Sequence, residues 1–174
     1  LLPGDSYVKV SKVEVNGKQV DFASAGTIAS IYISTAISSE NVPVGSAFAA
    51  PERTLQTANQ FVARISTFTM NVPLLKGAAL VFHRQAVDVP LQIAQIKSIL
   101  DKKTKKVKQK SPGFIPQNTM AEVVFRVQQP IPIDLNSESK SFGRFIIRAN
   151  GATLGYGSII DIIHDASQQH RSDE

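Results

Sequence analysis

The sequence contains no cysteine among its 174 residues. This absence excludes disulfides, thiolate zinc sites and cysteine nucleophiles, and it fits a reducing compartment such as the cytoplasm. No apolar run reaches the ~20 residues that a membrane span needs, so we expect no membrane partner. The first residues lack an initiator methionine and the long apolar stretch of a signal peptide, so we expect a piece of a longer protein.

Motifs that would hold a nucleotide or build an active site are also missing. Neither GxxxxGKS/T nor GxGxxG occurs, and Gly17-Lys18 lies in an expected hairpin turn. The serines have no GxSxG motif around them. The three histidines are not paired at metal-ligand spacing, and His83, which follows Phe82, is interpreted as a strand histidine that is packed or hydrogen-bonded near a sheet edge. We therefore predict that the chain is not an enzyme and holds neither metal nor cofactor of its own.

The residues that are present predict an all-β fold. Hydrophobic residues make up 43% and charged residues 19% of the chain, which is enough for a buried core. Apolar and polar side chains alternate along 61–66 and 121–127, a pattern that places one set inside and the other toward solvent. The inward sets are Phe61, Ala63 and Ile65, and Ala121, Val123, Phe125 and Val127.

Turn signals separate these runs. Asn16-Gly17 and Asn150-Gly151 each lie between apolar segments, and Asn-Gly tolerates the positive φ angles of a type I′ hairpin turn. The segment Gln92–Leu100 fits both helical and strand spacing, and we predict a strand because its neighbours are strands. Many short strands at even spacing are typical of a sandwich or a barrel.

Seven lysines lie in the most basic stretch, 97–110, six of them between residues 102 and 110, with Asp101 as the one acidic residue. One interpretation is contact with an RNA phosphate backbone, which would be sensitive to salt. The other is a solvated hairpin loop that charge keeps soluble. No aromatic residues are interleaved, so base stacking is not expected. The candidate ribosome contacts are Lys102, Lys103, Lys105, Lys106, Lys108 and Lys110.

The segment Gly143–Arg148 mixes arginines with apolar residues ahead of the Asn150-Gly151 turn. It can be a barrel strand with two outward arginines. It can also be a docking surface for a protein, because arginine and aromatic residues are enriched among the anchors of interfaces. The periodicity alone favours the first interpretation.

An ordered set of motifs resembles domain III of the elongation-factor-one-alpha superfamily of translational GTPases. The earlier segments 20–26 and 42–45 resemble the later strands of domain II, so the likeness runs from about Tyr7 to Ile163. The domain III set comprises Gln60–Ile65, Lys76-Gly77, Phe82-His83, Leu100–Thr104, Gly143–Arg148, Gly151, Thr153 and Gly157. Ile147 and Asn150 are mild departures from the family's pattern.

The resemblance implies two antiparallel β-barrels, a truncated domain II followed by a complete domain III. We expect residues 1–55 to form the partial first barrel, residues 56–164 the second, and residues 165–174 a disordered tail. It also implies a GTPase domain upstream, which would hold GTP and magnesium. The first strands of domain II would precede Leu1, so we expect this barrel to be incomplete in the present chain.

Within the superfamily the chain looks most like the Hbs-type ribosome-rescue factor, which acts in mRNA surveillance and no-go decay with a Pelota-type partner. The segments Val20–Gly26 and Val72–Gly77 and the lysine-rich hairpin carry this likeness. The class-two release factor and the superkiller-seven adaptor of the exosome and Ski complex are close alternatives. In relatives the Gly-Arg-Phe strand helps to hold the decoding partner. The resemblance thus makes Gly143, Arg144, Phe145 and Arg148 the candidate partner-binding residues.

Overall fold

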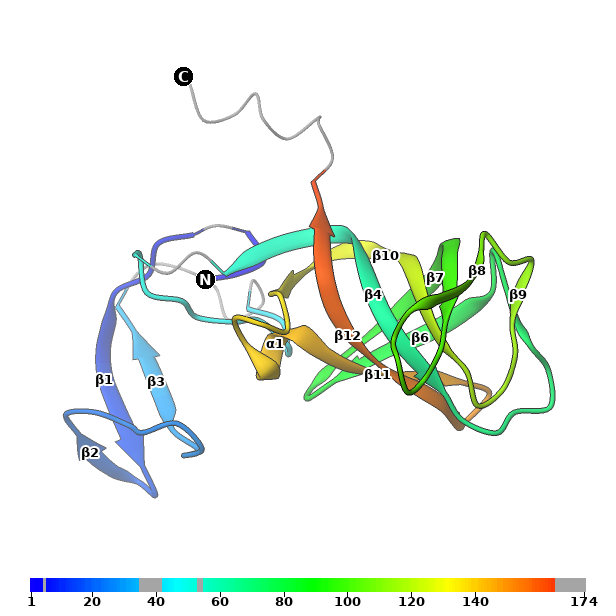
Figure 1. Cartoon of the computed structure of the whole chain (residues 1–174). Coiled ribbons are helices and arrows are strands. Elements are labelled where there is room, and N and C mark those ends of the chain that lie inside the picture. Colours follow the sequence, from blue (N-terminus) through cyan, green and yellow to red (C-terminus); the bar gives the residue numbers. More distant parts are fainter. Residues whose placement is uncertain (5, 35–41, 53–54, 165–174) are drawn as a thin grey trace.

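Nearly all regular structure in this protein is β-strand (Figure 1). A computed structural model describes residues 1–4, 6–34, 42–52 and 55–164. The predicted tail 165–174, with His170, lies outside the described residues. Among those residues, no helix is long and apolar enough to cross a membrane.

The first three strands form a small antiparallel sheet of their own, here called the N-terminal sheet. Its strands are β1 (Val10–Val15), β2 (Lys18–Val20) and β3 (Ser30–Ile33), in the order β2-β1-β3. Asn16 and Gly17 turn the chain between β1 and β2 with φ of 52° and 74°, which confirms the predicted Asn-Gly hairpin. Figure 1 shows this sheet beside the larger body of strands.

The larger body is a closed antiparallel barrel. Its sheet has the order β10-β4-β12-β11-β6-β7-β8, and a further pairing of β10 with β7 closes a ring of six strands. The short strands β5 and β9 pair separately. The bounds are β4 (Gln56–Thr67), β5 (Leu74–Leu75), β6 (Ala79–Arg84), β7 (Val87–Leu100), β8 (Val107–Lys110), β9 (Phe114–Ile115), β10 (Met120–Ile133), α1 (Lys140–Gly143), β11 (Arg144–Ala149) and β12 (Ala152–Ile163).

These strands confirm the all-β fold class that the alternation predicted, and they form the closed barrel that the family resemblance implied for domain III. Gln92–Leu100 is part of β7, as predicted, and Asn150-Gly151 joins β11 to β12 with φ of 49° and 77°. The N-terminal sheet is open within the part of the chain that the structure describes. Closure pairs the backbone N–H and C=O groups along both edges of the strands in the ring, whereas an open sheet keeps unpaired groups at its edges.

The core of the barrel is built from the inward sets that the alternation identified. Phe61, Ala63 and Ile65 are at most 1% exposed. The inward residues of β10, which are Ala121, Val123, Phe125 and Val127, are at most 2% exposed. Val62 and Val124 were expected to face solvent, but both are buried. Val62 and Val124 are register partners across β4 and β10, and the ion pair of Arg64 and Glu122 lies next to them. Each valine side chain therefore shields the other from water.

The N-terminal segment meets the barrel where Gly45 lies against Val87, the first residue of β7. A Cβ atom on Gly45 would lie 2.7 Å from Val87 Cγ2, so glycine permits this approach. Close by, Leu2 and Ala47 form an isolated antiparallel bridge, and both are buried. The two parts of the chain are therefore in direct contact.

Candidate protein-binding surface

Strand β11 presents two chemically different faces. Phe145 and Ile147 point into the barrel and are 3% and 0% exposed. Arg144, Ile146 and Arg148 alternate with them and are exposed. The period of two along a strand thus separates a folding face from a solvent face.

The two outward arginines are held by short polar contacts. Arg144 donates from Nε to Asn136 Oδ1 at 3.0 Å, and Arg148 donates from Nη2 to the carbonyl of Gly151 at 3.2 Å. Neither arginine has a carboxylate partner among the described residues. Each guanidinium carries five N–H donors, so most of its donors remain directed to solvent.

Apolar side chains from neighbouring strands lie between and beside these arginines. Ile146 pairs with Tyr156 on β12 and with His83 on β6, while Arg148 pairs with Val81. The ring of Tyr156 lies 5.8 Å from that of Phe68, and both rings are exposed. We call this surface the β11 face and define it by Arg144, Ile146, Arg148, Val81, Tyr156 and Phe68. Arginine and aromatic side chains around an apolar centre are typical of interface anchors.

The structure assigns Phe145 to the core, so the expectation that it contacts a partner is corrected. Its ring stacks on Phe82 at 4.9 Å and meets Phe61 and Phe125 edge-on at 5.6 and 5.9 Å. It lies over Gly157, its register partner on β12, where a Cβ atom would come within 2.4 Å of the ring. A side chain enclosed in this way is not accessible to a partner.

Gly143 also serves the fold. It ends α1, and a Cβ atom there would lie 2.4 Å from the Cα of Asn136, so the position has no room for a side chain. The side chain of Ser139 accepts a hydrogen bond from Phe142 N at the start of the same turn. Arg144 follows at once and reaches back to Asn136. The crowded turn therefore fixes where β11 begins and where its first arginine points.

Arg84 supports this turn, and sequence reasoning missed it. Its guanidinium is buried, donates from Nη1 to the carbonyl of Phe142 at 3.1 Å, and lies 4.8 Å from the ring of Phe142. Burial lowers the pKa of Arg84 to about 10, so the side chain stays protonated at neutral pH. The signal was present, because Leu80, Phe82 and Arg84 alternate on the inward side of β6.

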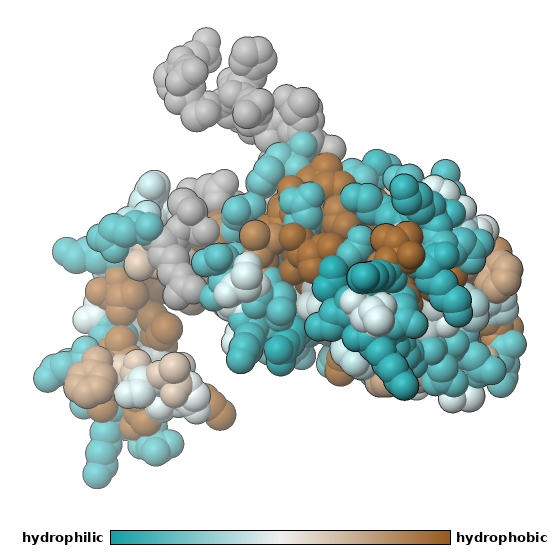
Figure 2. Space-filling model, viewed as in Figure 1, coloured by the Kyte–Doolittle hydropathy of each residue, from teal (hydrophilic) through white to brown (hydrophobic). Residues whose placement is uncertain are grey.

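The lysine-rich stretch forms a hairpin between β7 and the edge strand β8, as predicted. Asp101 holds its turn by accepting hydrogen bonds from the backbone N–H groups of Lys103 and Thr104 and from the hydroxyl of Thr104. These bonds lower the pKa of Asp101, with the Thr104 backbone bond as the largest cause. The lysine hairpin comprises Lys102, Lys103, Lys105, Lys106, Lys108 and Lys110, all exposed. Hydrophilic residues cover much of the surface around β8 (Figure 2).

His83 lies in β6 and its Nδ1 pairs with a carboxylate oxygen of Asp88, across the β6–β7 hairpin. This confirms a hydrogen-bonded strand histidine, although β6 is an interior strand of the barrel rather than a sheet edge. Within the described ranges, no group of three or more metal-ligating side chains is found.

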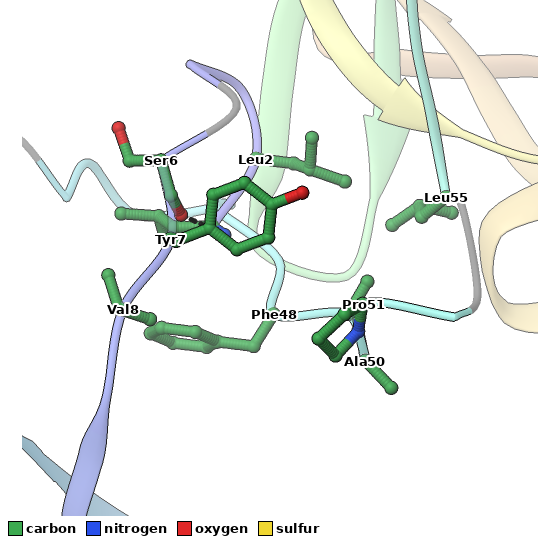
Figure 3. A pocket seen from close by; sticks show the side chains of 10 residues that line it. Leu2, Ser6, Tyr7, Val8, Phe48, Ala50, Pro51 and Leu55 are labelled. Carbon is green, nitrogen blue, oxygen red and sulfur yellow. Dashed lines mark hydrogen bonds between the residues drawn. The ribbon is translucent and has the colours of Figure 1, made fainter.

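A pocket of about 280 Å³ lies where the N-terminal segment meets the start of the barrel (Figure 3). The rings of Tyr7, Phe48 and Pro51 surround it together with Leu2 and Leu55. Among the described residues its lining holds no acidic, basic or histidine side chain. Its chemistry is that of an apolar packing junction between the two parts of the chain.

Comparison with known proteins gives this architecture a family. The family model of the GTP-eEF1A C-terminal domain-like proteins matches residues 60–160. Protein HBS1 of Drosophila melanogaster is 28% identical over 127 residues, which are 73% of this chain and 19% of that protein. Elongation factor 1-alpha of Ignicoccus hospitalis is 27% identical over 154 residues, which are 88% of this chain and 35% of that protein.

Solved structures show the same fold. The structure of sup35 complexed with GMPPNP superposes with a TM-score of 0.84 at 18% identity, over 94% of this chain and 39% of that chain. The chain thus spans at most about two fifths of the length of each relative named here. Since the family model covers more than half of its length, this chain belongs to the GTP-eEF1A C-terminal domain-like family, the C-terminal domains of translational GTPases.

Proposed function

We propose that this chain is the non-catalytic, partner-binding part of an Hbs-type translational GTPase that rescues stalled ribosomes in the cytoplasm. Its partner is a Pelota-type protein, and the process it serves is mRNA surveillance by no-go decay. The observation that carries the proposal is the β11 face, where Arg144 and Arg148 flank the exposed Ile146 and neither arginine is paired with a carboxylate of the described chain.

The barrel suits this role mechanically. Its closed ring and the cluster of four phenylalanines below β11 make a rigid support, so the outward side chains are presented without large ordering costs. A partner surface with carboxylates around an apolar centre complements the β11 face. Its arginines would then form charge-assisted hydrogen bonds that are shielded from water.

GTP and magnesium belong, in this proposal, to a separate domain of the whole protein. No GxxxxGKS/T motif occurs in the 174 residues, so the residues present do not fit a nucleotide site. The role of the barrel is to bind and orient the partner. A nucleotide-dependent change elsewhere alters the arrangement of rigid domains.

The lysine hairpin supplies a second contact, with ribosomal RNA. Its six lysines stand in solvent, and Asp101, the acidic residue among them, is engaged in its own turn. Neutralising four of them (Lys102, Lys103, Lys105 and Lys106 to Gln) should reduce the slope of log affinity against log salt by about 0.9 for each phosphate that these lysines no longer neutralise. An unchanged slope for ribosome binding would leave the hairpin as a solvated loop.

Identity to HBS1 and to elongation factor 1-alpha is nearly equal, so a binding experiment has to select the partner. Calorimetric titration should compare a Pelota-type protein, a stop-codon-decoding release factor and an exosome or Ski complex. Micromolar or tighter binding to the Pelota-type protein alone supports the proposal. Binding only to the release factor favours a class-two release factor subunit, and binding only to the exosome or Ski complex favours a superkiller-seven-type adaptor without GTP hydrolysis.

A further inference from the structure

A second basic feature lies on the barrel wall, apart from the β11 face and the lysine hairpin. It is an open groove of about 490 Å³ between the β5–β6 turn and the outer sides of β7 and β10, lined by Lys76, Gly77, Gln92, Ile93, Ala94 and Arg126. The β5–β6 turn is fixed to β7, because Gly77 N donates to the carbonyl of Ile93 at 2.8 Å and Ile93 N donates to that of Ala78 at 3.3 Å. The shape of the groove is therefore set by backbone hydrogen bonds.

The groove carries two cations and no acid. Lys76 and Arg126 are both exposed, and neither has a carboxylate partner in the described part of the chain. The nearest acid on β10 is Glu122, which is paired with Arg64 at 2.8 Å. Gln92, the register partner of Arg126, adds an amide group whose Nε2 reaches the carbonyl of Gly77 at 3.4 Å. Every polar side chain in the lining can therefore donate a hydrogen bond.

The groove and the lysine hairpin share one edge of β7. The edge is paired to the β5–β6 turn at Ile93, and four residues further on Ser111 N donates to the carbonyl of Lys97 at 2.9 Å, where the hairpin returns. Four residues of strand span about 13 Å. Lys97 is exposed on the stretch between them, and Lys110 pairs with Ser98 at the base of the hairpin. Lys97 thus places one basic side chain on β7 between the groove and the hairpin.

We infer that this groove, here called the Lys76–Arg126 groove, binds the phosphate backbone of RNA and extends the contact made by the lysine hairpin. The inference deepens the proposed ribosomal RNA contact and rests on it. No aromatic side chain lines the groove, so it contacts phosphates rather than stacking on bases, and its binding is independent of sequence. Arg126 suits bidentate contact with a phosphate, and Lys76 acts as a point charge at the rim.

The test measures binding of the 174-residue chain to a fluorescein-labelled RNA duplex as KCl rises from about 50 to about 200 mM. The test variant carries Lys76→Gln and Arg126→Gln together. Its control carries Lys18→Gln and Lys140→Gln, two exposed lysines on β2 and α1 that remove the same net charge elsewhere. Circular dichroism melting should show that both variants keep the wild-type fold.

If two phosphates are no longer neutralised, the slope of log affinity against log salt should fall by about 1.8. The loss of affinity over this salt range should then be roughly tenfold smaller than in the wild type, while the control keeps nearly the wild-type slope. If the test variant keeps the wild-type slope while the four-lysine hairpin variant has a reduced slope, the groove does not bind RNA phosphates. The contact of the hairpin with RNA is then still supported. Equal reductions in test and control variants also overturn the groove contact, because net charge alone would then explain the effect.

Two further outcomes separate the possible causes of failure. If the wild-type chain does not bind the duplex at any salt concentration, the hairpin contact and the groove contact both fall. If poly-glutamate competes with the duplex only when Lys76 and Arg126 are intact, and binds them more tightly than RNA does, the groove is a site for an acidic peptide and the RNA assignment is overturned.

Discussion

The barrel and the N-terminal sheet are built from the same alternating pattern, yet they bury their apolar residues to very different degrees. Phe125 and Ile65 in the barrel are 0% and 1% exposed, whereas Val10 and Ile31 in the N-terminal sheet are 47% and 44% exposed. Hydrophobic residues are accordingly visible on the surface of the N-terminal sheet (Figure 2). Alternation decides which face a side chain occupies, and closure decides whether that face is removed from water.

The energetic consequence follows from the area that each region buries. Removing an aliphatic or aromatic side chain from water contributes about 1.5–3 kcal/mol. A residue that remains nearly half exposed realises only part of that free energy. Equivalent truncations should therefore be costly in the barrel and mild in the N-terminal sheet.

The largest expected difference comes from Phe145→Ala in the barrel and Ile31→Ala in the N-terminal sheet. Phe145 contacts three other rings and is 3% exposed, so its loss should lower the free energy of unfolding by about 3–5 kcal/mol. Ile31→Ala should cost less than about 1 kcal/mol, because nearly half of that residue is already exposed to water. Urea unfolding followed by circular dichroism measures both. Similar losses in the two variants would contradict the claim that truncations cost more in the closed barrel than in the N-terminal sheet.

A smaller effect is expected from backbone crowding at the end of α1. Gly143→Ala places a Cβ atom against the backbone of Asn136, and overpacking of this kind costs about 1–3 kcal/mol. Gly113→Ala is the matched control, because no atom lies within 4 Å of a Cβ there and its φ is not positive. The control should change the free energy of unfolding by less than about 0.5 kcal/mol. Equal effects would mean that the crowding at Gly143 is relieved at no cost.

The smallest expected effect is a difference in how salt changes the pKa of two carboxylates, one in each region. The pKa of Glu14 in the N-terminal sheet is lowered mainly by its bond with Lys12 and then by the hydroxyl of Tyr32. The pKa of Asp101 is lowered mainly by backbone and hydroxyl donors of Thr104. For both, the stabilisation is present above the unfolded pKa and is lost as pH falls through the lowered folded pKa.

Salt should distinguish the two causes. Added KCl screens the exposed charge pair, so the Glu14 midpoint should rise toward its ordinary value of 4.5, whereas the Asp101 midpoint should stay below 3.8. Carboxyl carbon chemical shifts measured against pH by NMR give both midpoints. In a Thr104→Ala variant the Asp101 midpoint should rise, because one hydroxyl donor is removed. An equal response of both carboxylates to salt would contradict this assignment.

The sequence predicted an all-β sandwich or barrel because its strands carry their own signals, and the family resemblance implied the barrel. The inward residues of β4 and β10 and the Asn150-Gly151 turn are local patterns, and each is confirmed. Burial of Val62 and Val124 depends on the pairing of β4 with β10, which joins segments that lie far apart in the chain. Such register is not encoded in any one window of sequence.

The same reason explains how much of the β11 face the sequence predicts. Alternation within one strand suffices to identify Arg144 and Arg148 as outward residues. Val81 and Tyr156 join them through the pairing of β11 with β6 and β12, and the β6 pairing bridges more than sixty residues of chain. Family resemblance suggests Phe145 for docking, although its alternation with the arginines places it in the core.

The most direct test of this account compares partner affinity with stability in the variant Arg144→Ala, Arg148→Ala. Calorimetric titration with a Pelota-type protein should show binding weakened by at least about 30-fold, which is the 2 kcal/mol of an interface anchor, while the melting temperature stays close to that of the wild type. Arg126→Ala, which removes an exposed arginine from β10, should bind the partner as the wild type does. Unchanged affinity in the double variant, with the fold intact, would contradict the claim that the outward side of β11 binds the partner.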